Sequence, residues 1–396
     1  MNIIYSARFF GVGAAFLLNA GSTALAQPSF QALPCCATAI SADGRVVAGG
    51  GYRWTQETGL VELGSLPPPR DWATVACAAS ADGSVIVGYG LAELGLDYQA
   101  FRWTQDGGIV GIGDASSTWS IAWGVSGMGD VVVGEARTGR GIQAFRWTTP
   151  DIMIALGSLT GSRGTSVARG VSSNGSVIAG YSLNSDRNYE IFRWTAEKGM
   201  VGLGTLGFAL AVSGDGTAIV GRAGPNGFPE AFRHTAETGL VGLGDLPGAD
   251  NWSEAVAVSA DGSIVVGESF TDLPGGGAFI WDETHGMRQL HAVLLDAGLD
   301  VAGWTLSVAT GISADGRTII GRGIDPENNY LPWLATLGGP CRADFNRDGV
   351  TNSQDFFDFL AAFFAHDPAA DINNDGGVTT EDFFDFLEAF FAGCTR

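Results

Sequence analysis

The chain has 396 residues, of which 45% are hydrophobic, enough for one large closed domain and a small second one. Its 60 glycines indicate a globular protein dense in turns, not a disordered chain. A net charge of −21 argues against nucleic-acid binding, because phosphate groups require the opposite sign. An acidic balance suits an exported protein that binds cations.

Residues 1–26 have the features of a bacterial signal peptide. Arg8 supplies a positive charge, residues 9–18 an apolar core, and Ala24-Leu25-Ala26 a cleavage site of small residues before Gln27. A buried N-terminal helix is the alternative. The apolar run is too short to span a membrane, and no later stretch reaches the ~18 apolar residues that a span needs. We therefore expect a secreted or cell-surface protein whose mature chain has no membrane span.

A repeated phrase organises residues 27–338, and its clearest copy covers residues 80–113. Ser-Ala-Asp-Gly at 80–83 predicts a tight hairpin between two strands, because Gly accepts a positive φ. Ala-Phe-Arg-Trp-Thr at 100–104 predicts a third strand, and the Gly-bounded Ile/Val run at 108–113 a fourth. One copy therefore predicts a four-stranded antiparallel meander.

The phrase occurs seven times. Its turn position is occupied by Asp43, Asp82, Met128, Asn174, Asp215, Asp261 and Asp315. The Phe-Arg-Trp strand returns around Trp54, Trp103, Trp147, Trp194, His234, Trp281 and Trp333. Repeats of roughly 40–50 residues with four strands each are typical of propeller blades, because a meander buries both faces only within a ring. The predicted fold is an all-β seven-bladed propeller over residues 27–338, followed by a small all-α domain.

The last repeat, from Thr310 to about Leu337, lacks a fourth strand. Residues 29–33 resemble that missing strand, so we expect them to pair with the strand around Trp333. Such closure removes sheet edges that would otherwise invite aggregation.

Tryptophans precede four of the first strands, at Trp72, Trp119, Trp252 and Trp304. Two interpretations stay open. The rings could form a carbohydrate platform on one face of the propeller, since aromatic faces stack on sugars. We favour the second interpretation, in which each ring packs between neighbouring blades.

These units resemble the HAF repeat of extracellular bacterial proteins. The shared features are the Ser-Ala-Asp-Gly hairpin, the Val-x-Gly strand, Ala-Phe-Arg-Trp and Leu-Gly-x-Leu, over roughly residues 30–337, although Met128 and His234 depart from the pattern. The resemblance implies an exported bacterial repeat protein and no established activity.

Beyond a short linker at 338–340 the composition becomes acidic and Phe-rich. Two segments, 344–355 and 371–382, have oxygen-bearing residues at the spacing of an EF-hand-type calcium loop, with Gly at the sixth position for the sharp turn. The expected ligands of two Ca²⁺ ions are Asp344, Asn346, Asp348, Val350, Asn352 and Asp355, then Asp371, Asn373, Asp375, Gly377, Thr379 and Asp382. The seventh position of each loop contributes a backbone carbonyl.

Each loop leads into a helix rich in phenylalanine. Phe356, Phe359, Leu360 and Phe363 form one stripe, which should pack against its duplicate. Phe357 and Phe364 form a second stripe, which is either core or an exposed adhesive patch for a partner.

Residues 341–396 resemble a type I dockerin, and more closely the GC-type dockerin of exported planctomycete-like bacterial proteins, through the duplicated loops, the Asp-Phe-Phe-Asp-Phe-Leu runs and the terminal Gly-Cys. The resemblance implies binding to a cohesin-like or cell-surface partner, with recognition residues Ser353, Gln354, Thr380 and Glu381. These pairs differ between the two halves.

Five cysteines are informative in an exported chain. Cys341 and Cys394 bracket the tail, and we expect them to form a disulfide. Cys35 or Cys36 could pair with Cys77, which leaves one odd thiol.

No catalytic signature is present: the four histidines form no metal-ligand pair, and the repeated turn aspartates lie in different repeats. We expect a secreted non-catalytic binding protein with a calcium-dependent anchor. The alternative is an exported propeller hydrolase or lyase that acts on polysaccharide and is tethered by the same tail.

Overall fold

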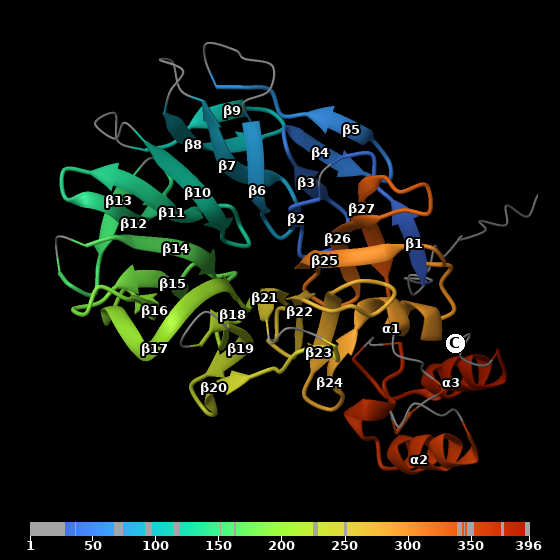
Figure 1. Cartoon of the computed structure of the whole chain (residues 1–396). Helices are drawn as coiled ribbons and strands as arrows, with labels where there is room; N and C mark the ends of the chain where they lie inside the picture. The colour runs from blue at the N-terminus through green and yellow to red at the C-terminus, as the bar shows by residue number, and fades with distance from the viewer. Residues whose placement is uncertain are drawn as a thin grey trace, which may run out of the picture.

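The computed structural model describes residues 28–35, 37–66, 74–91, 97–113, 119–150, 152–161, 164–224, 229–248, 252–338, 343, 345–346, 352–373 and 376–392. These residues form an all-β propeller, with sheets arranged around a central axis, and a small helical C-terminal region (Figure 1). The expected signal peptide, residues 1–26, lies outside the described residues.

The first three repeats each form a four-stranded antiparallel sheet in chain order. The first contains β2 (Ala39–Ile40), β3 (Val47–Gly49), β4 (Tyr52–Thr55) and β5 (Gly59–Glu62). The second contains β6 (Thr74–Ala79), β7 (Val85–Leu91), β8 (Tyr98–Thr104) and β9 (Gly108–Gly111). The third contains β10 (Ser120–Val125), β11 (Val131–Thr138), β12 (Gly141–Thr148) and β13 (Ile152–Gly157).

The remaining repeats complete the ring. Repeats four and five contain β14 (Ser166–Val171), β15 (Ile178–Leu183), β16 (Tyr189–Thr195), β17 (Gly199–Val212), β18 (Ala218–Ala223), β19 (Glu230–Thr235) and β20 (Gly239–Gly242). Repeat six contains β21 (Ser253–Val258), β22 (Ile264–Ser269), β23 (Ala278–Asp282), β24 (Gly286–Gln289) and the helix α1 (Leu290–Asp296). Repeat seven contains β25 (Thr305–Ile312), β26 (Thr318–Ile324) and β27 (Tyr330–Thr336).

The prediction of seven separate blades is wrong. The structure has five four-stranded blades, and repeats four and five share one sheet of seven strands, in the order β14-β15-β16-β17-β18-β19-β20. The cause is β17, which is the last strand of one repeat and the first strand of the next. In repeats one, two, three and five the fourth strand ends at Glu62, Gly111, Gly157 and Gly242, before the first strand of the next repeat begins. Here pairing continues from Leu206 through Gly207 to Phe208 without a break.

The predicted closure of the ring is confirmed. The N-terminal strand β1 (Ser29–Ala32) pairs antiparallel with β27, and Ala32 lies opposite Trp333. The sheet order β1-β27-β26-β25 therefore joins the beginning of the chain to its last repeat. Phe30 packs edge-on against Trp304 at 5.2 Å, which adds an aromatic contact to the closure.

Hydrogen bonds between the hairpin turns form a second, continuous circle. The backbone N–H of one turn donates to a carbonyl of the next turn, at 2.8–3.2 Å. The seven donor–acceptor pairs are Asp43–Ala81, Ala81–Gly127, Gly127–Ser173, Ser173–Gly214, Asp215–Ala260, Ala260–Ala314 and Ala314–Ala42. These hydrogen bonds pair backbone groups of the turns that would otherwise have no partner.

The repeated Ser-x-Asp-Gly motif has a structural role in each turn. In the second repeat the buried Ser80 hydroxyl donates to Asp82 at 2.9 Å and accepts the backbone N–H of Val85 at 3.0 Å. Gly83 takes a φ of +65°, which favours glycine. In the third repeat Met128 occupies the turn position, and Asp130 accepts the Ser126 hydroxyl instead, at 2.6 Å.

Acid should weaken these turns. The N–H of Ser84, which donates to Asp82 at 2.9 Å, is the main cause that lowers the pKa of this carboxyl. A lowered folded-state pKa stabilises the fold above the ordinary pKa of ~3.9, and this contribution is lost as pH falls through the folded-state value. Asp82→Asn keeps the acceptor, as Asn174 does naturally. We expect this variant to unfold at lower urea than the native chain near neutral pH, with no difference in strong acid; an equal difference at both pH values would contradict the assignment.

The Phe-Arg-Trp strand joins neighbouring repeats from both of its faces. Its phenylalanine is fully buried in repeats two to six, at Phe101, Phe145, Phe192, Phe232 and Phe279. On the opposite face, as alternation along a strand requires, Arg233 Nε donates to the carbonyl of Gly262 in the next turn at 2.7 Å. Arg102 makes the corresponding bond to Gly129 at 3.2 Å.

The loop tryptophans that the structure describes pack against protein. Trp304 lies in the core cluster around Trp333, and Trp252 stacks on Phe270 with ring centroids 4.3 Å apart. Trp72 lies outside the described residues. These contacts favour packing over the carbohydrate platform at Trp252 and Trp304.

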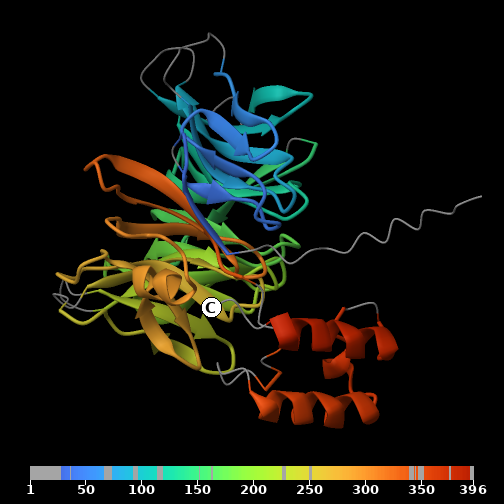
Figure 2. The same ribbon diagram turned by 90° about the vertical axis from the view of Figure 1, so that its right-hand side faces the viewer.

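The C-terminal region contains α2 (Ser353–Phe364), the short 3-10 helix η1 (Pro368–Ala370) and α3 (Thr380–Ala392). The two helices lie side by side (Figure 2). Phe359 and Phe386 are fully buried between them and stack face to face at 4.0 Å. The prediction that the first phenylalanine stripe packs against its duplicate is confirmed.

Candidate functional site

A β-bulge interrupts the innermost strand of repeats two to seven. One residue is left out of the pairing register with the second strand in repeats two to six, and two residues, Ser307 and Thr310, are left out in repeat seven. The bulged residues at the corresponding position of the six repeats are Cys77, Trp123, Arg169, Leu210, Val256 and Thr310. A bulge re-aims a side chain without changing the rest of the strand, and such bulges are common beside binding and catalytic sites.

The glycine of the Val-x-Gly motif makes room for each bulge. A Cβ at Gly134 would lie 1.9 Å from the carbonyl oxygen of Ile121, and a Cβ at Gly180 would lie 1.9 Å from that of Val167. No atom beyond hydrogen fits there. The motif that marks the repeat in the sequence is therefore the partner of the bulge on the neighbouring strand.

The bulged residues meet at one cavity on the axis of the ring. Its volume is about 240 Å³, and five of the six bulged side chains line it, Val256 being the exception. The innermost strands β2, β6, β10, β14, β17, β21 and β25 supply its wall, and they surround the central axis in Figure 1. We call this region, with the charged and aromatic side chains that contact it, the channel mouth.

Trp123 and Arg169 are the largest bulged side chains, and they contact each other. The guanidinium of Arg169 lies 4.0 Å from the centre of the Trp123 ring. The indole Nε1 of Trp123 donates to Glu135 at 2.9 Å. Burial raises the pKa of Glu135, although the Trp123 hydrogen bond and the charge of Arg169 oppose the rise.

Repeats five and six contribute a second cluster of charged side chains. Arg222 pairs with Glu254 at 3.4 Å and lies over the ring of Phe208 at 4.9 Å. Burial raises the pKa of Glu254, against the charges of Arg222 and Arg169. Burial also raises the pKa of Glu268, and the charge of Glu254, its cross-strand neighbour, raises it further. Carboxyls with raised pKa values beside arginines are typical of functional sites. Of these charged side chains, Arg169 is the one that lines the cavity.

Cys77 belongs to this region and is a free thiol. Burial raises its pKa to about 12, so the thiol is neutral and a poor nucleophile. Cys77 is thus not bridged to Cys35, and Cys36, the other suggested partner, lies outside the described residues. The expected Cys341–Cys394 disulfide lies outside the described residues.

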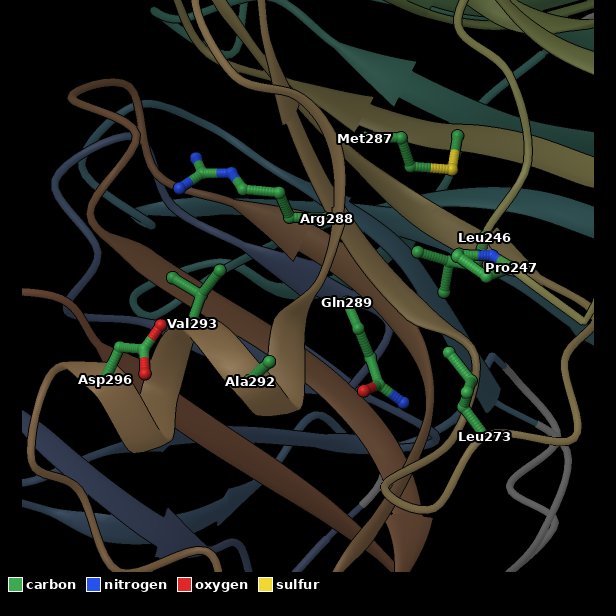
Figure 3. Close-up of a pocket in the computed structure, with 9 residues that line it drawn as sticks. All are labelled: Leu246, Pro247, Leu273, Met287, Arg288, Gln289, Ala292, Val293 and Asp296. Atoms are coloured by element: carbon green, nitrogen blue, oxygen red, sulfur yellow. The ribbon is translucent and has the colours of Figure 1, made fainter.

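A second cavity lies at the rim, between α1 and the loops at Leu246 and Leu273 (Figure 3). Its volume is about 450 Å³, and Met287, Val293 and Pro247 make it largely apolar. Arg288 pairs with Asp282, although its Nε is buried without a hydrogen-bond partner, and the Gln289 amide donates to the carbonyls of Pro274 and Gly276. Because this rim cavity is largely apolar, the channel mouth is the better candidate for a polar ligand.

The expected calcium ligands fall partly within the described residues. Asp344, Asp348, Val350 and Asp375 lie outside them. The two residues at the last position of the loops, Asp355 and Asp382, are fully buried and equivalent. Asp355 accepts the backbone N–H groups of Asn346 at 3.2 Å and Asn352 at 2.8 Å. Asp382 accepts those of Asn373 at 3.2 Å and Thr379 at 2.8 Å.

The second loop also shows the turn that its glycine was expected to allow. Gly376 has a φ of +96°, and its N–H donates to Asp371 at 3.0 Å. Asp371, the first loop position, and Asp382, the last, thus bracket the turn.

The described residues, which omit Asp344, Asp348 and Asp375, contain no group of three or more His, Cys, Asp or Glu side chains that could hold a metal ion. Residues 352–392 contain no lysine or arginine, and their one histidine, His366, is exposed. The buried Asp355 and Asp382 accept backbone N–H groups but have no lysine or arginine partner within that stretch, and a bound cation would offset the cost of burying them. The ligands would be those expected from the sequence, including the backbone carbonyls of Val350 and Gly377.

The recognition residues that the dockerin resemblance implies are all exposed. Ser353, Gln354, Thr380 and Glu381 lie at the first turns of α2 and α3. Phe357 and Phe364 are 62% and 76% exposed, and their counterparts Phe384 and Phe391 are 65% and 81% exposed. At about 100° per residue, Ser353, Phe357 and Phe364 share one face of α2. The second stripe is therefore a surface patch.

Among the described residues, none of the helices combines the length and the apolarity needed to cross a membrane. No family model and no curated protein matches this chain. Several solved structures are similar in fold. TolB from Acinetobacter baumannii is 14% identical with a TM-score of 0.43, and the match covers 65% of each chain.

A puromycin hydrolase is 13% identical with a TM-score of 0.47, over 80% of this chain and 54% of that one. An oligogalacturonate lyase from Vibrio parahaemolyticus is 8% identical with a TM-score of 0.35, over 79% of this chain and 97% of that one. This chain thus spans less than two thirds of the TolB and hydrolase chains. At such identities the likeness concerns the fold alone.

Proposed function

We propose that this chain is a secreted, non-catalytic repeat protein of the HAF type, in which the propeller binds a ligand and a dockerin-like tail attaches it to a partner. The export signal in residues 1–26 brings the chain outside the cell. The tail binds two Ca²⁺ ions, and its outer face docks on a cohesin-like or cell-surface protein.

One observation carries the proposal: the buried carboxylates Asp355 and Asp382 receive equivalent hydrogen bonds in two halves of the tail. The described parts of the two halves therefore share this hydrogen-bonding pattern. Calcium would neutralise both carboxylates and hold each loop against its helix. Docking through the tail is then calcium-dependent, because the helices that present the outer patch rest on these loops.

The outer patch consists of the exposed phenylalanines of the two helices, so it contains two similar binding faces that differ in their polar residues. Phe357 and Phe364 on α2 correspond to Phe384 and Phe391 on α3. The polar residues beside them differ, since α2 begins with Ser353-Gln354 and α3 with Thr380-Glu381. A partner that requires the acidic Glu381 would use only one of the two faces.

The experiment is surface plasmon resonance of the full mature chain against a panel of cohesin modules, with calcium and with a chelator. We expect binding that requires calcium. Phe391→Ala should weaken the affinity by at least about tenfold, the loss typical of an aromatic hot spot. Tyr330→Ala, at an exposed position on the propeller, is the matched control. Binding that survives chelation would contradict a calcium-dependent anchor.

A second candidate function, hydrolysis or lysis of a polysaccharide, is favoured by one observation. Glu254 and Glu268 lie opposite each other on β21 and β22, and burial raises the pKa of both. A raised pKa makes a carboxyl better suited to act as a general acid. Product release from polysaccharides by the full chain, lost in Glu268→Gln, would establish this function over the non-catalytic one.

A further inference from the structure

We propose that the channel mouth binds a neutral, hydroxyl-rich molecule of the size of a mono- or disaccharide. The proposal rests on the binding role given above to the propeller and does not depend on the tail. It goes further in naming the residues and the ligand class.

The repeats are most alike in their turns and differ most at the bulge. Ser and Gly of the hairpin recur in all seven copies, whereas the bulged residues include a thiol, an indole, a guanidinium, two aliphatic groups and a hydroxyl. The second varied position follows the Val-x-Gly glycine, at Tyr89, Glu135, Tyr181, Arg222, Glu268 and Arg322. Both varied positions lie next to each other on paired strands. The structure therefore concentrates its chemical differences at one end of the channel.

The charges at the mouth disfavour a ligand with a strong charge of either sign. Arg169 projects into the cavity and lies on Trp123, and Arg222 is paired with Glu254. An anion would meet Glu135, Glu254 and Glu268. A cation would meet Arg169, which lies in the wall of the cavity itself. Hydroxyl groups avoid both conflicts, because each can donate to a carboxylate and accept from a guanidinium.

Aromatic rings provide the apolar complement that sugar rings use. Tyr89 lies 6.1 Å from Trp123 and 5.0 Å from Tyr98, measured between ring centres. On the next repeats Tyr181 lies 4.8 Å from Phe208. The C–H faces of a sugar stack on such rings, while its hydroxyls reach the charged groups between them. A cavity of about 240 Å³ accommodates one or two sugar rings.

Among the residues that follow the Val-x-Gly glycine in each repeat, one has a buried polar atom without a protein partner. The Nε of Arg322, the residue of repeat seven that corresponds to Tyr89, is buried and makes no hydrogen bond with the described residues. Buried donors without a partner are rare in stable folds, and a ligand hydroxyl or a water would satisfy this one.

The opposite end of the channel offers no comparable chemistry. Its cavity of about 140 Å³ is lined by small and aliphatic residues of the turns, including Ala81, Gly127 and Ala260. Their backbone groups already pair in the circle of hydrogen bonds between turns. The ligand site is therefore confined to the bulge end.

The test is isothermal titration calorimetry of the full mature chain with three kinds of disaccharide: neutral ones such as xylobiose and cellobiose, a digalacturonate, and a deacetylated chitobiose. We expect binding of a neutral disaccharide. Arg169→Met and Glu135→Gln should each weaken it by at least about tenfold, because each removes a charge-assisted hydrogen bond. Arg140→Met, on an exposed hairpin, makes the same charge change away from the mouth and should leave the affinity unaltered.

Thermal unfolding of all three variants checks that the fold is intact. Preference for the acidic or the cationic disaccharide would overturn the ligand class. So would the absence of any binding at about 10 mM ligand, where weak affinities are still measured. Equal loss in Arg140→Met would overturn the location. Calcium chelation should leave this affinity unchanged, which separates a failure here from a failure of the anchoring role.

Discussion

Gly134→Ala should be among the most destabilising single substitutions in the propeller. The added Cβ would lie 1.9 Å from the carbonyl oxygen of Ile121 and 2.8 Å from the Phe145 ring. Neither atom has room to move, because the first belongs to the bulged backbone and the second is fully buried. Overpacking of this kind costs about 1–3 kcal/mol when side chains give way, and more when backbone must move. We expect a loss of at least about 3 kcal/mol.

Urea denaturation followed by tryptophan fluorescence measures this loss. Gly139→Ala is the matched control, because Gly139 lies in the turn after the same strand with open space around its Cα. It should change the free energy of unfolding by less than about 0.5 kcal/mol. Equal stability of the two variants would mean that the bulged backbone does leave room for a Cβ at Gly134, which would contradict this explanation.

Asp382→Asn should remove the contribution of the second loop to the calcium-dependent stability of the tail. The substitution removes one negative charge from a fully buried ligand position while keeping its size. Binding of a cation to the folded state alone stabilises by mass action, about 2.7 kcal/mol at a free concentration 100 times the dissociation constant. We expect calcium to raise the melting temperature of the native tail and to raise that of the variant much less.

Differential scanning calorimetry of the full chain, with calcium and with a chelator, separates the tail's transition from that of the propeller. Glu388→Gln is the control, since this residue is exposed on the same helix. If calcium did not change the melting temperature of the native tail, the assignment of the loops would be contradicted. A control that loses the calcium response together with Asp382→Asn would also contradict it.

Much of the fold follows from local signals in the sequence. The Asp-Gly turns and the Phe-Arg-Trp strand predict the meander, because both act through short-range geometry. The strand at residues 29–33 predicts the closure, because the last repeat lacks a fourth strand. The number of separate blades does not follow in the same way. It depends on whether a strand stops between repeats, and β17 runs unbroken from Gly199 to Val212.

The channel mouth was not visible in the sequence. A bulge inserts one residue without breaking the pattern of apolar residues, and Cys77, Trp123 and Arg169 share no chemistry that would mark a motif. The available signal was the glycine of Val-x-Gly. Its recurrence inside a strand, where glycine weakens pairing, indicates a close backbone approach. The second signal was the position of the bulged residue, where the residue type differs from repeat to repeat although the neighbouring positions are regular.

The tail is the opposite case, since its expected ligands follow from spacing alone. The described part of the structure places Asn346, Asn352 and Asp355 in one loop, and Asp371 with Asp382 in the other. The split of the phenylalanines into a buried and an exposed stripe required the helix pair itself. Spacing identified the two stripes, but only the packing of Phe359 on Phe386 decides which one faces solvent.

The central claim is that the tail holds calcium in two equivalent loops. Equilibrium dialysis of the full mature chain against calcium measures this directly, as bound ions per chain. The account predicts two ions for the native protein and one for Asp382→Asn. No bound calcium, or a stoichiometry that Asp382→Asn leaves unchanged, would contradict it.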